Sequence, residues 1–310
     1  MLISAPEGWT VTASIDNSNP TTLSVTPPNQ DGAEGIITLQ VNKGVYWAID
    51  QIKVRSKRVI TSWYQEFLAG AEIVVNDVTI KKGSADNKVV INGEEVDLTV
   101  DLIDTDNAEI TADGLYFIGA GLNVTYKNSQ NKNKVLINDS PTGEKPVVTC
   151  SNTITLEGAS LVCKNIALVS PSSKFLTIKN SSAPFVTFDG CDLNILASTA
   201  QEFLDVDGMV MENFSFCNSK MKIERNSYRV LNIGLTQVTF PKVQIENSVF
   251  YAPGSGALQF KLVFVNNDNN TQAGITSFIL RNTTFINAHY LGQGIVSCLL
   301  YTSDAADDKA

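Results

Sequence analysis

Hydrophobic and polar positions follow one short pattern repeatedly through the second half of the chain. The pattern is an apolar residue, any residue, Asn or Gly, two further residues, and then Leu or Phe. The stretch VQIENSVF at 243–250 holds one copy, and the six copies have the central residues Gly119, Asn165, Gly190, Asn213, Asn247 and Asn282. Asn and Gly tolerate left-handed backbone, so each copy predicts a corner between two strands. Ordered copies separated by 23 to 46 residues indicate a structural repeat.

A second pattern, x-Leu-x-apolar, alternates with the first. It reads FLTI, FLDV, VLNI and ALQF, and its leucines are Leu176, Leu204, Leu231 and Leu258. Their spacing of 28, 27 and 27 residues predicts two short strands in each repeat, with the leucines stacked on the inward face. So short a repeat cannot bury enough apolar surface alone, so successive repeats must stack into a coil with one continuous core.

With these two patterns, the chain resembles the right-handed parallel β-helix of the pectate-lyase-like superfamily. The resemblance covers about residues 110–297 and rests on the coil pattern. It implies an all-β fold whose main body is a right-handed parallel β-helix, a solenoid. The chain is also similar to uncharacterised secreted or surface β-helix proteins that gut Bacteroidota encode beside polysaccharide-uptake genes.

The patterns divide the chain into four segments. Residues 1–57 alternate like part of a small β-sandwich module, immunoglobulin-like or jelly-roll, which precedes the β-helix. Residues 58–109 are expected to hold a linker, a cap and possible first coils, and SWYQEFLAG predicts a short helix there, because an open coil end needs a cap. Residues 110–297 form the β-helix. The tail, 298–310, breaks every pattern and resembles translated sequencing-adapter read-through, so we expect a non-native tail on a fragment that has lost its signal or anchor.

Composition narrows the choice of partners and metals. The formal net charge of −9 argues against nucleic acid, and no apolar run is long enough to span a membrane. We expect a secreted protein or one on the outer cell surface. The four cysteines before the tail form no Cys-x-x-Cys pair, which argues against zinc. The sequence leaves open whether they are buried thiols or disulfides; they are Cys150, Cys163, Cys191 and Cys217.

Candidate glycan contacts fall on the predicted outward positions of the x-Leu-x-apolar strands. One column holds polar residues, and the adjacent column begins with Phe175 and Phe203. Sugar rings bind where hydrogen-bonding groups adjoin a flat aromatic face. Coverage of both phenylalanines by a loop is the competing interpretation. The polar column is predicted to contain Thr177, Asp205, Asn232 and Gln259.

Charged residues near the same strands suggest two kinds of chemistry. Asp205 and Asp207 share a strand face and could bind Ca²⁺, although two such carboxylates are also common on surfaces. Arg229 is the candidate catalytic base, because the resemblance implies clustered carboxylates with an Arg or Lys base. The basic stretch SKMKIERNSYRV around it could attract an acidic polysaccharide, or it could be a solvated loop. The single histidine, His289, is expected to be structural or solvent-facing.

Three functions fit these patterns. The first is a carbohydrate-binding β-helix protein associated with polysaccharide utilisation. Its ligand could be a pectin-like polysaccharide, which it would bind without cleaving. The second is a polysaccharide lyase, which requires Asp205, Asp207 and Arg229 to act together. The third is a structural adhesin or spike-like rod. Hydrolysis is disfavoured, because the Asn-x-Asp, Asp-Asp, His-Gly and Arg-x-Lys strings of the superfamily's glycosidases do not occur in order.

Overall fold

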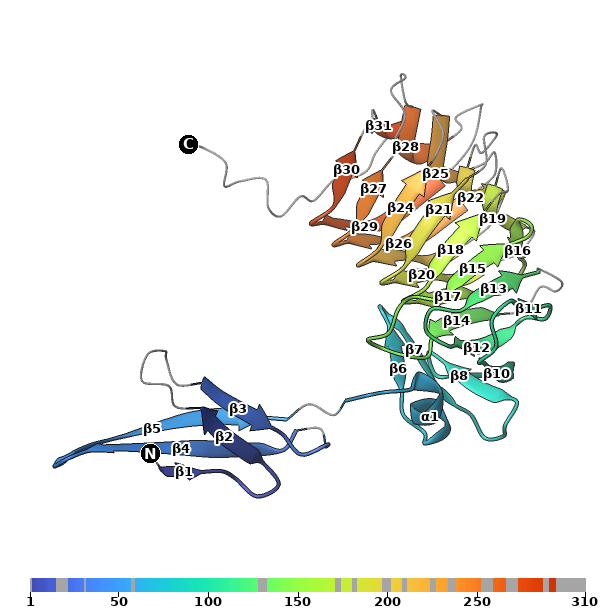
Figure 1. The fold of residues 1–310 in the computed structure, drawn as a ribbon. Helices are drawn as coiled ribbons and strands as arrows, with labels where there is room; N and C mark the ends of the chain where they lie inside the picture. The colour runs from blue at the N-terminus through green and yellow to red at the C-terminus, as the bar shows by residue number, and fades with distance from the viewer. Residues whose placement is uncertain are drawn as a thin grey trace, which may run out of the picture. The chain divides into compact units, whose positions relative to one another are not determined.

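The structure is a computed structural model that divides into two compact units, residues 1–60 and 61–310 (Figure 1). No helix within the described residues has the length and apolar character needed to cross a membrane. The structure describes residues 2–14, 22–30, 32–56, 59–127, 133–170, 174–179, 183–196, 202–207, 211–223, 227–233, 238–251, 259–265, 273–286 and 290–293. The predicted tail, 298–310, lies outside these described residues.

Three parallel sheets wind through the second unit (Figure 1). The first sheet contains, in spatial order, β10 (Thr99–Ile103), β12 (Gly114–Ile118), β14 (Lys134–Asn138), β17 (Leu161–Lys164), β20 (Ala183–Asp189), β23 (Met211–Cys217), β26 (Val238–Glu246) and β29 (Ala273–Arg281). The second contains β11 (Ala108–Ile110), β13 (Asn123–Tyr126), β15 (Val147–Cys150), β18 (Ala167–Ser170), β21 (Asp192–Ile195), β24 (Lys220–Ile223), β27 (Val249–Tyr251) and β30 (Thr284–Ile286). The third contains β16 (Ile154–Leu156), β19 (Lys174–Lys179), β22 (Glu202–Asp207), β25 (Ser227–Ile233), β28 (Gln259–Val265) and β31 (Tyr290–Gln293).

This arrangement confirms the predicted parallel β-helix. A coil runs from the first sheet to the second and then to the third, so it holds three strands and not the predicted two. The stretch VQIENSVF ends a first-sheet strand, turns a corner and starts a second-sheet strand, whereas x-Leu-x-apolar lies in the third sheet. The third sheet begins only at β16, and the earlier coils therefore lack its strand.

The predicted column of leucines is correct over three coils and wrong at the fourth. Leu176 pairs with Leu204, and Leu204 pairs with Leu231. The next partner of Leu231 is Val263, whereas Leu258 lies outside the described residues. The prediction assumed a constant repeat length, but the connection before β28 is longer than its predecessors, and strand pairing sets the register.

Most of the predicted corners are confirmed by their backbone. Asn165, Asn247 and Asn282 have φ of 52°, 49° and 47°, and Gly190 has φ of 66°. These values lie in the left-handed region that Asn and Gly tolerate best. The short pattern therefore records a local backbone requirement.

Two predicted corners are wrong. Asn213 lies inside β23, where it pairs with Phe185 and Lys242, and Asn218 turns this corner with φ of 53°. The pattern missed Asn218 because Met221 stands where it required Leu or Phe. In the earlier coil the left-handed residue is Gly121, with φ of 70°, and not Gly119.

Stacked corners are joined by a ladder of side-chain amides. The Asn282 amide donates to Asn247 Oδ1 at 3.1 Å, and the Asn247 amide donates to Asn218 Oδ1 at 3.2 Å. The Asn218 amide donates to Asp189 Oδ1 at 2.8 Å. Each of these bonds links one coil to the next, so Asn supplies both the left-handed turn and a contact between coils.

Apolar side chains fill the coil interior in one continuous cluster. Phenylalanines from successive coils stack along it, with ring centroids 5.9 Å apart for Phe188 and Phe216 and 5.0 Å apart for Phe216 and Phe250. Such tilted pairs add attraction beyond the burial of their surface. The four cysteines named above are buried free thiols, which settles the alternative that the sequence left open.

A small antiparallel subdomain precedes the β-helix within the second unit. It contains α1 (Trp63–Leu68), as SWYQEFLAG predicted, and the sheet β6 (Ile73–Val75), β7 (Val78–Lys82), β8 (Lys88–Ile91) and β9 (Glu94–Asp97). Its core includes Phe67, which packs on Phe117 of β12 with ring centroids 5.5 Å apart. The subdomain therefore covers the outer face of the first sheet, since Phe117 alternates with the inward Tyr116 and Ile118.

The β6–β7 hairpin extends further along that face. Asn76 at its tip donates to the carbonyl of Phe188 at 3.1 Å and to Ser215 Oγ at 2.8 Å, in two successive coils. The adjacent Asp77 pairs with Lys242 of the following coil. Lys164 Nζ donates to the carbonyl of Val74 at 3.0 Å. The hairpin thus binds four coils together.

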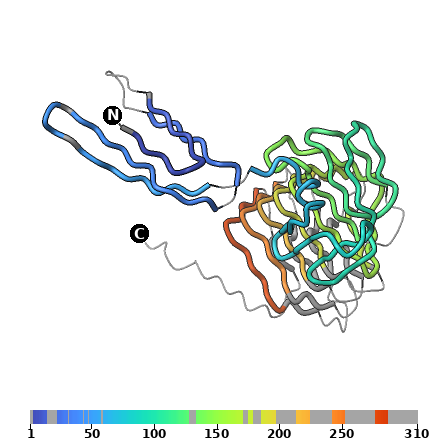
Figure 2. Tube along the Cα trace, turned by 90° about the horizontal axis from the view of Figure 1, so that it is seen from below, coloured from blue at the N-terminus to red at the C-terminus, as the bar shows by residue number. Residues whose placement is uncertain are grey.

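The first unit contains two small antiparallel sheets (Figure 2). One joins β1 (Leu2–Ser4), β4 (Glu34–Lys43) and β5 (Tyr46–Arg55), and the other joins β2 (Thr10–Ser14) and β3 (Thr22–Thr26). Ile37 is buried, whereas Val45, Tyr46 and Ile49 of the β4–β5 hairpin are exposed. Burial alternates along β2 as predicted for a sandwich module, but nearly all of the described side chains of β5 are exposed, so the described strands enclose little apolar core.

Candidate functional site

The predicted glycan face on the third sheet loses two of its members. Phe175 is 0% exposed and belongs to the interior cluster, where its ring centroid lies 6.3 Å from that of Phe188. Thr177 is only 6% exposed. Strict strand alternation placed both outside. Burial of the Phe175 ring against the next coil removes more apolar surface from water, and it overrides that alternation.

Strand register aligns three of the four residues of the predicted polar column. Thr177 pairs with Asp205, and Asp205 pairs with Asn232. The next position is occupied by Phe264, while Gln259 pairs with Ser227, so the prediction for Gln259 is wrong. The cause is the same longer connection that displaced Leu258 from its column.

For the predicted base and metal ligands, the structure gives the strand positions and not the side chains. Arg229 pairs with Glu202, three positions before the Asp205–Asn232 pair, so it is not the cross-strand neighbour of Asp205. Asp207 pairs with Lys179. The side chains of Phe203, Asp205, Asp207, Arg229, Asn232 and Gln259 lie outside the described part, as does His289.

A metal or acid–base site requires several titratable side chains close together. Among the described side chains, no group of three or more His, Cys, Asp or Glu residues could hold a metal ion. On the first sheet, Asp189 lies 2.8 Å from Lys164 Nζ and also accepts from Asn218. Glu246 accepts from Gln244 at 3.1 Å and approaches Arg281 at 3.9 Å. These contacts give both carboxylates a structural role.

The outer face of the second sheet carries an aromatic, amide and basic strip that the sequence analysis missed. Asn194 of β21 pairs with Lys222 of β24, and Lys222 pairs with Tyr251 of β27. The three occupy one register position on three consecutive coils. Tyr251 is 37% exposed, Lys222 is exposed and Asn194 is half-buried. We call these three residues, together with Lys145, Asp192 and Lys220, the second-sheet strip.

Most of the charged residues that define the strip are basic, although the chain as a whole is acidic. Lys145 Nζ lies 2.9 Å from Asp192 Oδ1, with side-chain exposures of 29% and 43%. Lys220, the cross-strand neighbour of Asp192, is exposed. Three lysines therefore accompany one carboxylate. The alternation in KMKI, with both lysines outward and Met221 and Ile223 buried, was a signal available in the sequence.

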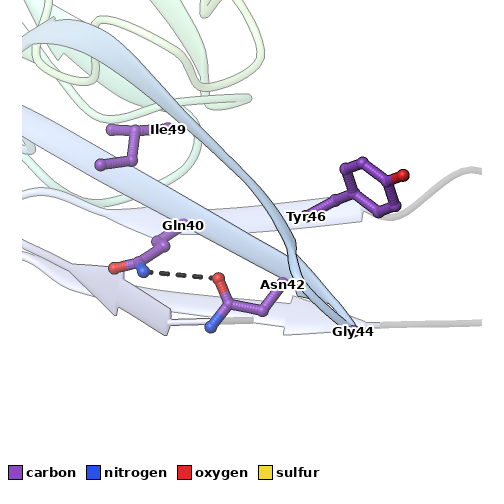
Figure 3. A pocket seen from close by; sticks show the side chains of 5 residues that line it. All are labelled: Gln40, Asn42, Gly44, Tyr46 and Ile49. Carbon is purple, nitrogen blue, oxygen red and sulfur yellow. Dashed lines mark hydrogen bonds between the residues drawn. The ribbon is translucent and has the colours of Figure 1, made fainter.

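A shallow pocket of about 350 Å³ lies on the first unit, at the β4–β5 hairpin (Figure 3). Gln40, Asn42, Gly44, Tyr46 and Ile49 line it. The Gln40 amide donates to Asn42 Oδ1 at 3.4 Å, and Figure 3 shows the Tyr46 ring lying apart from that pair. The pocket is open, and its lining side chains do not converge on one point.

Comparisons of the chain with protein-family models, with curated proteins and with solved structures found no match in any of the three.

Proposed function

We propose that this protein binds an acidic polysaccharide along the second-sheet strip, without turning it over. The observation that supports this most directly is the register of Asn194, Lys222 and Tyr251 on three consecutive coils. Neighbouring strands of a sheet lie about 4.8 Å apart, so the strip offers binding groups at regular intervals to an extended polymer. A polymer of repeating sugar units is a ligand suited to such a surface.

Each part of the strip suits one feature of an acidic glycan. The Tyr251 ring provides a flat apolar face on which a sugar ring can stack. The Asn194 amide nitrogen and Asp192 Oδ2 provide hydrogen-bonding groups for hydroxyls, since Oδ1 of both residues is buried. The lysines attract carboxylate or sulfate groups. A protein with this role meets its ligand outside the cell, so we propose a secreted or surface location.

The test is affinity electrophoresis through gels containing polygalacturonate, another acidic polysaccharide or a neutral glucan. Wild-type protein is expected to be retarded in the acidic gels, and less so at high salt, because salt screens exposed charges. Combined Lys222→Ala and Tyr251→Ala substitutions should abolish the retardation. Lys127→Ala removes another exposed lysine near the second sheet, paired with Glu109 at 2.7 Å, and should leave retardation unchanged.

Three outcomes would decide against the proposal. Equal loss of retardation in Lys127→Ala would show a general charge effect. The steady appearance of unsaturated uronate products, abolished in Arg229→Ala, would establish the polysaccharide lyase instead. Absence of retardation in every gel would favour a structural rod. A chelator arm tests Ca²⁺ at Asp205 and Asp207, since a bridging cation would make retardation depend on it.

A further inference from the structure

Three polar side chains meet among the buried apolar residues of the first coils. Lys134 Nζ lies 3.2 Å from Asp113 Oδ2, and both side chains are 0% exposed. The hydroxyl of Tyr126 donates to Asp113 Oδ1 at 2.7 Å, and Tyr126 is itself buried. The second-sheet strip does not use this cluster.

The sheet register holds the lysine and the carboxylate on neighbouring coils. Lys134 begins β14, and Asp113 directly precedes β12, its parallel partner. Lys134 pairs with Leu161, which lies in the interior cluster, so its side chain points inward. The two reactive groups therefore have little freedom to separate, which is the condition under which proximity accelerates a reaction most.

The surroundings favour chemistry between the two groups. Burial lowers the pKa of Lys134, although Asp113 opposes this shift, and a neutral amine is the nucleophilic form of lysine. Burial, followed by the hydrogen bond to Asp113, raises the pKa of Tyr126, so its hydroxyl keeps its proton and remains a donor. Because bulk water is excluded, it does not hydrate the reacting amine and carboxyl groups or compete with their condensation.

We propose that Lys134 and Asp113 condense into an intramolecular isopeptide bond that joins the two coils covalently. One proton moves from the Lys134 ammonium to Asp113 Oδ2, which leaves a neutral amine and a neutral acid. Nζ then attacks Cγ, and Tyr126 stabilises the negative charge that develops on Oδ1. A second proton passes from Nζ to Oδ2, which departs as water. The amide keeps one hydrogen on Nζ, and no oxidant or other reactant is required.

The physical benefit follows from removing a buried ion pair. Two charges inside a protein lose their hydration, and their mutual attraction offsets this loss only when the surrounding geometry is favourable. A neutral amide carries no such penalty, and it fixes the chain between residues 113 and 134 as a closed loop. The bond would join the coil of β12, which lacks a third-sheet strand, to the coil of β14, the first that contains one.

Intact-mass spectrometry of the denatured full chain tests the proposal. The wild-type mass is expected to be lower than the sequence mass by one water, and digestion should yield a branched peptide joining residues 113 and 134. Lys134→Met should restore the full mass. Tyr126→Phe keeps both reacting groups and should slow the loss of water during incubation after purification. An uncrosslinked wild-type chain would overturn the proposal, whether or not the variants fold.

Two controls distinguish the isopeptide bond from reactions elsewhere that remove the same mass. Asp113 precedes Gly114, and a succinimide at this dipeptide would also lose one water. A succinimide would persist in Lys134→Met and be hydrolysed by mild alkali, so either result would contradict the isopeptide bond. Lys164 and Asp189 form a second, partly exposed ion pair at 2.8 Å, and Asp189 is also followed by a glycine, Gly190. Lys164→Met should leave the wild-type loss of water intact.

Discussion

At the residue scale, asparagine at the corner performs two functions that no other residue combines as well. Its backbone adopts φ near 50°, and its amide continues the ladder that joins Asn218, Asn247 and Asn282. Glycine satisfies the backbone alone, as Gly190 does with φ of 66°. Alanine satisfies neither requirement. The repeated Asn and Gly therefore indicate that each coil avoids the steric strain of other residues in a left-handed backbone.

We predict that Asn247→Ala destabilises the protein more than Asn247→Gly does. The alanine variant loses the ladder bonds and keeps a Cβ in the left-handed region without the polar side chain that lets Asn tolerate it, for a total of about 2–3 kcal/mol. The glycine variant loses the bonds alone and should cost about 1 kcal/mol. Equilibrium urea unfolding of both variants measures the difference. Equal costs would show that the left-handed backbone contributes nothing measurable at this corner.

At the scale of elements, the β6–β7 hairpin explains why the outer face of the first sheet changes character along the coils. Leu115, Val135 and Val162 occupy one outward column and pack beneath the antiparallel subdomain. The column continues as Thr187 and Ser215, where the hairpin tip contributes hydrogen bonds instead. The subdomain covers the outer side of the first strands of this sheet.

We predict that Asn76→Gly loosens the hairpin without unfolding the β-helix. Glycine keeps the left-handed backbone of Asn76, which has φ of 52°, but removes the amide that contacts two coils. The loss should be about 1–2 kcal/mol, and it should appear as faster amide hydrogen exchange in β6 and β7. Asn92→Gly is a matched control, since Asn92 also has positive φ, at 49°, but bonds within the subdomain, to Thr79. Equal acceleration in both variants would contradict the assignment.

At the scale of the whole molecule, the interior carries ionisable groups that make stability depend on pH. Burial raises the pKa of Cys150 and Cys191 to about 12, from an ordinary 9.0, and it raises those of Cys163 and Cys217 as well. Unfolding returns each thiol to water, where it ionises at its ordinary pKa. Because the folded pKa is the higher one, stability is fully present below about pH 9 and is lost as pH rises toward 12.

We predict that the free energy of unfolding falls between about pH 8 and pH 10, and that Cys150→Ala reduces this fall. Each buried thiol lowers the free energy of unfolding by about 1.4 kcal/mol for each pH unit above its unfolded pKa. The fall between the two pH values should therefore be about 1.4 kcal/mol smaller in the variant than in the wild type. Val148→Ala, at a buried position of the same strand, lowers stability without removing a thiol and should keep the wild-type pH dependence. Urea unfolding at both pH values provides the measurement. An unchanged pH dependence in Cys150→Ala would refute the role of the thiol.

Features that depend on short-range chemistry could be predicted from the amino-acid sequence. Left-handed corners need Asn or Gly, so Asn165, Gly190, Asn247 and Asn282 could be located from their letters. The regular spacing of Leu176, Leu204 and Leu231 was enough to predict stacked parallel coils. The helix at 63–68 also followed from a short segment.

Which side chains face outward, and which residues become neighbours across coils, depends on how the whole chain packs. Phe175 occupies an outward position by alternation, yet its ring joins the core because the next coil offers Phe188 as a partner. Val263 replaced Leu258 beneath Leu231 because pairing along the whole strand outweighs one short match. The alternation in KMKI marked Lys220 and Lys222 as outward, but their grouping with Asn194 and Tyr251 could not be predicted, since these residues become neighbours only after three coils stack. Short sequence patterns specify backbone turns. The free energies of burial and of strand pairing, in contrast, depend on contacts between distant segments of the chain.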